Sequence, residues 1–286
     1  MSIDLFAPVL DCAGRPLRLD RARVVGILNV TPDSFSDGGR FVRLDEAVER
    51  GVQMAEEGAA LIDIGGESTR PGAQPVGVDE ELRRVIPVIE RLRARTQAIL
   101  SVDTSKPAVM NAAAAAGAGM INDVRALREP GALEAAAISG CAVCLMHMLG
   151  EPRTMQDAPR YRDVVAEVRL FLEQRVEASL AAGIAAERIV LDPGFGFGKT
   201  LEHNLELLRH LPALSVEGLP LLAGLSRKSM VGKLTGRPAE ARIHGSVALA
   251  VVAALHGARI LRVHDVGETV DAMKIVAAVQ VPAGNP

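Results

Sequence analysis

The chain has 286 residues, of which 49% are hydrophobic and 23% are charged, the composition of a globular protein with a large core. Its net charge of −3, the absence of tryptophan and the single tyrosine argue against nucleic acid as a partner. No run of 18 apolar residues occurs and the first residues lack a basic leader, so we expect a cytoplasmic protein that spans no membrane.

Apolar, strand-like runs alternate with helix-like segments along the whole chain. The strands are expected at 24–30, 60–66, 98–103, 119–124, 141–147, 188–194, 220–226 and 258–265. The helices are expected at 45–58, 79–95, 106–117, 130–139, 163–183, 202–211, 240–257 and 267–279. The third helix has clear boundaries, with Pro107 in its first turn and Gly117 after its alanine run.

Strict alternation of eight strands with eight helices predicts a parallel sheet covered by helices. Eight such units in roughly 250 residues favour a single-domain α/β fold, the (β/α)8 or TIM barrel, over an open sheet. We expect the barrel to span residues 23–286. Residues 1–22 form an N-terminal extension, whose stretch LDCAGRPLRLD is expected to be a short hairpin at the bottom of the barrel.

Cys141 and Cys144 form a C-x-x-C pattern, with His147 three residues further on. A metal or redox site is one interpretation of this pattern. However, CAVCLMH is typical of a buried strand, on which residues three apart point to opposite faces. We therefore expect the two cysteines to pack in the core.

Polar residues stand near the carboxyl ends of the predicted strands, which is where barrel enzymes have their active sites. They are Asn29, Asp63, Glu67, Ser101, Asp103, Asn122, Asp123, Asp192, Ser226, Arg227, Lys228, Arg262 and His264. Any one of them could cap the following helix, and we prefer that interpretation for Asp123 and Asp265. Helix capping alone does not explain polar residues after seven of the eight strands.

The stretch DPGFGFGKT resembles a phosphate-binding loop but does not satisfy the pattern. The loop requires glycine where this chain has Pro193, and a dinucleotide fingerprint requires glycine where it has Lys199. We expect a glycine-rich turn after the sixth strand that presents Phe195 and Phe197 to a ligand.

The polar set contains amides, carboxylates and a lysine, which suit the hydrogen-bonding edge of a flat heterocycle. Arg262 and His264 are two residues apart on one strand, so they can bind one anion together. With Asn29 beside them in a closed barrel, they offer a site for a phosphate and its metal ion.

Seven motifs, in order and spacing, resemble those of the dihydropteroate synthase family. They are GILNVTPDSFSDGG, DIGGESTRPGA, VDTSKP, MHMLGEPRTMQ, LDPGFGFGK, SRKS and RVHD. The resemblance extends from about Val24 to Ile275. It implies a (β/α)8 barrel that condenses a 6-hydroxymethyl-dihydropterin diphosphate with p-aminobenzoate (4-aminobenzoate) and releases diphosphate in folate biosynthesis, by an SN1-like path.

The resemblance also implies roles for individual residues. Asp103, Asn122, Asp192 and Lys228 would hold the pterin. Arg262 and His264 would bind the diphosphate, with Thr69 nearby, and Asn29 and Asp37 would face a Mg2+ cofactor. Phe197, Pro71 and Ser226 would border the p-aminobenzoate, and Phe35, Asp37 and Arg70 would lie on two mobile loops. The residues expected to act in catalysis are Lys228, Asp103, Asp192, Arg262 and His264.

Two other functions remain open on the sequence alone. Pterin-dependent methyltransferases resemble this family in barrel and pterin pocket, but the complete TPDSFSDGG loop and SRKS favour the synthase. A non-catalytic pterin-binding relative would be expected to lack Lys228, Arg262 or the TPDSFSDGG loop, all of which are present here. The family resemblance further implies a homodimer, and the family it points to is the target of sulfonamides.

Overall fold

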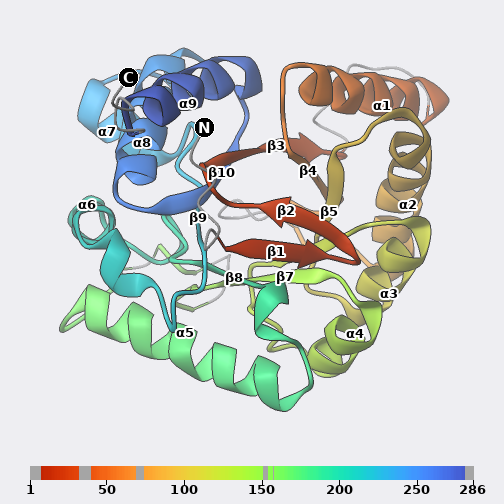
Figure 1. Ribbon diagram of the computed structural model, residues 1–286, viewed down its shortest axis with the longest axis horizontal. Coiled ribbons are helices and arrows are strands. Elements are labelled where there is room, and N and C mark those ends of the chain that lie inside the picture. Colours follow the sequence, from red (N-terminus) through yellow and green to blue (C-terminus); the bar gives the residue numbers. More distant parts are fainter. Residues whose placement is uncertain (1–7, 32–39, 69–73, 151–153, 157, 281–286) are drawn as a thin grey trace, which may run out of the picture.

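The computed structural model describes residues 8–31, 40–68, 74–150, 154–156 and 158–280. Eight parallel strands close into a barrel in the order β10-β3-β4-β5-β6-β7-β8-β9, with helices around it (Figure 1). The strands are β3 (Arg23–Asn29), β4 (Leu61–Gly65), β5 (Ile99–Asp103), β6 (Met120–Asp123), β7 (Ala142–Met146), β8 (Ile189–Asp192), β9 (Leu221–Ala223) and β10 (Ala258–Val263). This arrangement confirms the predicted (β/α)8 barrel.

The helices follow the strands in the predicted order, with one addition. They are α1 (Arg40–Glu56), α2 (Val78–Arg95), α3 (Pro107–Ala116), α4 (Ala132–Ser139), α5 (Val164–Ala181), α6 (Leu201–Arg209), α7 (Ser229–Thr235), α8 (Ile243–Leu255) and α9 (Val266–Gln280). The sequence did not predict α7, whose seven residues are too few to show a helical period before Gly236 ends it with a φ of 71°. None of the described helices is long and apolar enough to cross a membrane.

The boundaries of α3 match those expected from the sequence. Pro107 occupies the first turn, and Gly117 ends the helix in the left-handed region with a φ of 112°. Helix α6 begins with a capping box in which the Thr200 side chain accepts from His203 N and the His203 side chain accepts from Thr200 N.

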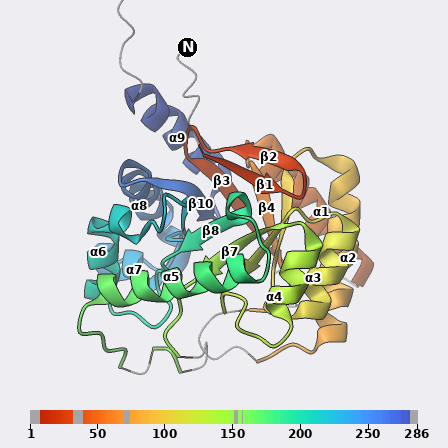
Figure 2. The same ribbon diagram turned by 60° about the horizontal axis from the view of Figure 1, so that its bottom comes forward.

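An antiparallel hairpin precedes the barrel. Strands β1 (Val9–Cys12) and β2 (Arg15–Arg18) pair from Val9 with Arg18 to Cys12 with Arg15. The hairpin lies across the middle of the ring of helices in Figure 1 and at one end of the barrel in Figure 2. Leu10 and Leu17 of the hairpin pack inside the barrel at the amino-terminal ends of its strands, which we call the lower interior. The hairpin thereby buries the apolar end of the barrel.

Side chains inside the barrel change from apolar to polar along most of the strands. The lower interior cluster contains Val25, Leu61, Ile99, Met120, Ala142, Cys144, Val190, Leu222 and Ile260. Because side chains alternate along a strand, the next inward position on most of these strands lies two residues nearer the carboxyl end. On β4, for example, this position is Asp63. The two-residue period therefore places polar groups at the end of the barrel opposite the hairpin.

The cysteines occupy different layers of this core. Cys141 packs in the large cluster between strands and helices, whereas Cys144 lies in the barrel interior. Both are buried free thiols. The prediction that the two cysteines are core residues on opposite faces is confirmed.

Candidate active site

Four neighbouring strands bring residues at their carboxyl ends into one row. In the sheet register, Asn29 pairs with Gly65, Gly65 with Asp103, and Asp103 with Asn122. Gly65 has no side chain, so the space beside Asn29 and Asp103 stays open. A Cβ at this position would lie 3.7 Å from Asn29 Oδ1 and 3.8 Å from Asp103 Oδ2. The row forms one side of the barrel mouth.

Asp63 lies at the centre of a buried hydrogen-bond network one layer below this row. Its Oδ1 accepts from Ser101 Oγ at 2.6 Å, and its Oδ2 accepts from Asn122 Nδ2 at 2.9 Å and from Arg262 Nε at 2.6 Å. The amide of Asn122 donates to Asp63, so its carbonyl oxygen remains for another partner. Asp63 therefore fixes the orientation of Asn122 and of Arg262.

Arg262 connects Asp63 to Asp103. Its Nη2 donates to Asp103 Oδ2 at 2.7 Å, so one guanidinium binds two carboxylates. Burial raises the pKa of Asp103 to about 7, because it outweighs the opposing effect of Arg262, and the charge of Asp63 adds to the rise. Asp103 can therefore exist in either protonation state near neutral pH.

The other side of the mouth carries Asp192 and Lys228. Asp192 Oδ1 accepts from Gly194 N at 2.7 Å, and burial raises the pKa of this carboxyl against the effect of Lys228. Lys228 Nζ donates to Phe195 O and lies 4.8 Å from the centre of the Phe197 ring. Burial lowers the pKa of Lys228 to about 8, although Asp192 opposes this shift. The Lys228 ammonium group therefore lies over the Phe197 ring and near the buried carboxyl group of Asp192.

Arg262 and His264 have different partners. Arg262 binds the two carboxylates, whereas His264 Nδ1 lies 3.1 Å from Ser226 Oγ, which also accepts from His264 N. The buried carboxylates of neighbouring strands attract the Arg262 guanidinium into the barrel. The binding of one anion by both side chains, expected from their spacing, stays a prediction.

Three expectations are corrected. Phe195 is not presented to a ligand: its side chain is fully buried in the core between strands and helices. Asp123 accepts from Arg125 N and Leu127 N, so it caps a turn ahead of α4. Asp265 forms an ion pair with Arg227. Both carboxylates have structural partners, as expected, but neither acts as the helix cap that we expected.

Five of the predicted site residues lie outside the described residues. They are Phe35, Asp37, Thr69, Arg70 and Pro71. Of the predicted metal ligands, only Asn29 is described, and its amide oxygen is of the kind that Mg2+ prefers. Within the described ranges, no group of three or more His, Cys, Asp or Glu side chains could hold a metal ion. The oxygen donors beside Gly65 fit a hard cation better than a soft one.

Asp63 is among the polar residues that the sequence places at the barrel mouth, but neither it nor Lys199 was expected to have a specific role. The two-residue period of its strand could have placed Asp63 inside the barrel, with Leu61 below it. Lys199 is 3% exposed, and nothing in its local sequence indicates that it is buried.

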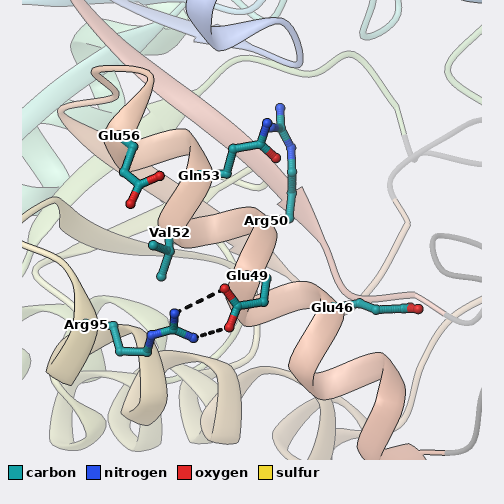
Figure 3. A pocket seen from close by; sticks show the side chains of 7 residues that line it. All are labelled: Glu46, Glu49, Arg50, Val52, Gln53, Glu56 and Arg95. Atoms are coloured by element: carbon teal, nitrogen blue, oxygen red, sulfur yellow. Dashed lines mark hydrogen bonds and ion pairs between the residues drawn. The ribbon is translucent and has the colours of Figure 1, made fainter.

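A separate hollow of about 520 Å³ lies on the outside of the barrel, against α1 and Arg95 of α2 (Figure 3). Glu46, Glu49 and Glu56 line it, and Glu49 forms an ion pair with Arg95. Its lining combines these glutamates with two arginines, Gln53 and Val52, and is typical of a solvated helix surface. The candidate active site is therefore the barrel mouth.

A (β/α)8 barrel with buried carboxyl, amide and ammonium groups at its mouth defines a class of enzymes that bind a hydrogen-bonding heterocycle. Comparison with known proteins identifies the family: the profile described as "Pterin binding enzyme" matches residues 25–264. Dihydropteroate synthase of Escherichia coli K12 is 56% identical over 93% of this chain and 94% of its own. The Haemophilus influenzae synthase is 52% identical over 91% and 94%.

Solved structures agree with this comparison. Xanthomonas albilineans dihydropteroate synthase with 4-aminobenzoic acid superposes with a TM-score of 0.91 at 62% identity, covering 96% of this chain and 100% of that one. The complex of this bacterium's synthase with 7,8-dihydropteroate gives a TM-score of 0.88 at 59% identity, with the same coverage. The chain therefore belongs to the pterin binding enzyme family and, within it, to the dihydropteroate synthases.

Proposed function

We propose that the chain condenses (7,8-dihydropterin-6-yl)methyl diphosphate with 4-aminobenzoate, giving 7,8-dihydropteroate and diphosphate for folate synthesis. The observation that supports this reaction most strongly is 56% identity to the Escherichia coli synthase over 93% of the chain. The relatives' complexes with 4-aminobenzoic acid and with 7,8-dihydropteroate support the same pair of reactants.

Asp103, Asn122, Asp192 and Lys228 are proposed to hold the pterin. The three strand-end residues are at most 9% exposed, so a heterocycle between them would exchange hydrogen bonds with groups already shielded from water. Carboxylates accept from the amino-pyrimidine edge, and the free carbonyl oxygen of Asn122 is a further acceptor. Lys228, on the same side of the mouth as Asp192, would supply a donor.

The bond that breaks joins the pterin methylene carbon to the diphosphate oxygen, and the arylamine nitrogen forms the new bond to the same carbon. An arylamine is neutral at pH 7, so it can attack without losing a proton first. Its nitrogen becomes positively charged when the new bond forms, and a proton then leaves to solvent. Departure of diphosphate is the difficult step, and an SN1-like path leaves positive charge on the pterin methylene. Asp103 and Asp192 would stabilise that charge through their proximity.

Arg262 and His264 are proposed to bind the diphosphate, with Thr69 beside it. In this proposal Arg262 keeps its ion pairs with Asp63 and Asp103 while its remaining N–H donors contact a phosphate. Asn29 and Asp37 would hold Mg2+, which would supply positive charge to the leaving diphosphate.

Phe197, Ser226 and Pro71 are proposed to border the 4-aminobenzoate, with Phe35, Asp37 and Arg70 on the two loops that would cover it. A homodimer is a proposal that follows from the family resemblance, and a cytoplasmic location is a proposal that follows from the sequence.

The reaction is tested by mixing the purified chain with both substrates and Mg2+ and quantifying diphosphate and 7,8-dihydropteroate by mass spectrometry. We expect one diphosphate per dihydropteroate and little release when 4-aminobenzoate is omitted. Asp192→Asn provides a control with a damaged pterin site. Equal diphosphate release with and without the amine would contradict the condensation.

A further inference from the structure

The glycine-rich turn after β8 has an unusual feature: side chains bind every carbonyl oxygen from Gly194 to Thr200. Lys228 donates to Phe195 O, Gln156 to Gly196 O, Tyr161 to Gly198 O, and Asn204 to Lys199 O and Thr200 O. Lys199 donates the two remaining hydrogen bonds, to Gly194 O at 2.9 Å and to Phe197 O at 3.0 Å. A turn with this many side-chain partners holds a single backbone conformation.

The resemblance of DPGFGFGKT to a phosphate-binding loop does not predict these contacts of Lys199 with the turn. Its ammonium group is buried, and its third partner is His147 Nδ1 at 2.9 Å. Burial lowers the pKa of Lys199, and burial together with Lys199 lowers that of His147 to about 2. Both effects on His147 favour a neutral imidazole, whose Nδ1 lies within hydrogen-bonding distance of the lysine. The lysine of a phosphate-binding loop faces its ligand, whereas this one is turned into the protein beneath the turn.

Two glycines bring the turn against the segment after β7. A Cβ on Gly194 would lie 1.9 Å from His147 O, and one on Gly198 would lie 2.6 Å from Leu149 O. Both glycines have positive φ, 68° and 65°. The chain approaches so closely that only glycine fits, which leaves the turn no lateral freedom.

The two halves of the turn depend on Lys199 to different degrees. Gly194 has other partners, since its N–H donates to Asp192 and its carbonyl also accepts from Phe197 N. Phe195 is held by its buried ring. Phe197 O accepts from Lys199 alone among the described residues, and its half-buried ring packs on the Met146, Met148 and Met155 cluster. Loss of the lysine should therefore release Phe197 before it disturbs Asp192.

We propose that Lys199 is a positioning residue for the arylamine substrate, because it fixes the backbone from which Phe197 presents its ring beside Lys228. This inference rests on the proposed function, in which Phe197 borders 4-aminobenzoate. The lysine touches neither substrate and acts through Phe197.

The test is Lys199→Met, which keeps a long side chain but cannot donate. We expect the KM for 4-aminobenzoate to rise by about tenfold to a hundredfold, as small displacements of contact groups do. The Kd for the pterin diphosphate, measured by calorimetry without the amine, should stay within about twofold, since Asp192 and Asp103 keep their partners. Tyr161 is the chain's single tyrosine and there is no tryptophan, so its emission reports on this turn. Acrylamide should quench that emission more strongly in the variant than in the unsubstituted chain.

Tyr161→Phe is the matched control, because it removes one donor from the same turn without affecting Phe197 O. Its KM for the amine should change by less than about twofold. An equal rise in both variants would overturn the proposal, as would a folded Lys199→Met protein with unchanged KM and unchanged quenching. Equal losses for both substrates would also overturn it. If Lys199→Met does not fold, Lys199→Gln, which retains an amide donor, decides by the same comparison of KM and Kd. Failure of the unsubstituted chain to form dihydropteroate would instead refute the proposed function.

Discussion

Asp63→Asn is the most informative single substitution in the barrel mouth, because it removes one charge and almost no volume. Asp63 is 1% exposed, and its two oxygens accept from three donors. An asparagine can keep its carbonyl oxygen toward Arg262 and Asn122, while its amide faces Ser101 Oγ, which can rotate to accept. The substitution therefore converts the ion pair with Arg262 into a hydrogen bond from the charged guanidinium to a neutral amide oxygen.

The loss in the free energy of unfolding depends on the partners that Arg262 keeps. Arg262 keeps Asp103 as a partner, so it does not become an isolated buried charge. Hydrogen bonds to charged groups contribute roughly 1.5–3 kcal/mol, so we expect a loss of about 2 kcal/mol in the free energy of unfolding. For a chain of 286 residues this corresponds to a melting temperature lower by about 3–4 °C. Asp63→Ala, which leaves three donors without their acceptor, should cost roughly 3–5 kcal/mol.

Urea unfolding followed by far-UV circular dichroism measures both variants, since the chain has no tryptophan for fluorescence. Ser101→Ala serves as the control and should cost only about 1 kcal/mol, because it removes a single neutral donor. An Asp63→Asn protein within about 0.5 kcal/mol of the unsubstituted chain would refute the importance of the ion pair.

Three further predictions concern the same mouth. The pKa of Asp103 is raised from 3.8 to about 7, so the folded state binds a proton that the unfolded state has lost, and this contribution to stability declines as the pH rises from about 4 to about 7. Asp103→Asn should flatten that decline in urea midpoints, and parallel curves for the two proteins would contradict it. Asp192→Ala should weaken pterin binding by about 1–3 kcal/mol because it leaves ligand donors unpaired, and an unchanged affinity by calorimetry would exclude this role. Arg262→Ala should weaken binding of the diphosphate substrate more than that of the bare hydroxymethyl-pterin, and equal losses would assign Arg262 a purely structural role.

The order of the elements could be predicted because it depends on local patterns. Continuous apolar runs mark strands covered on both faces, and Pro107 and Gly117 mark the ends of a helix whichever partners it packs on. The position of the barrel mouth could also be predicted, because the carboxyl ends of parallel strands lie at the same end of a barrel.

Side-chain partners could not be predicted in the same way. Phe195 and Phe197 have the same sequence context, but one is core and the other lies beside Lys228. Their directions depend on three glycines with positive φ, and no hydrophobic period describes such a turn. The ion pair of Arg262 with Asp63 joins residues 199 positions apart, so only the closed barrel brings them together.

The most direct measurement of the central claim is a crystal structure of this chain with 7,8-dihydropteroate. We predict the pterin edge within hydrogen-bonding distance of Asp103, Asn122 and Asp192, and the aryl ring against Phe197. A ligand bound elsewhere, such as the hollow against α1, with an unoccupied barrel mouth would contradict the proposed site.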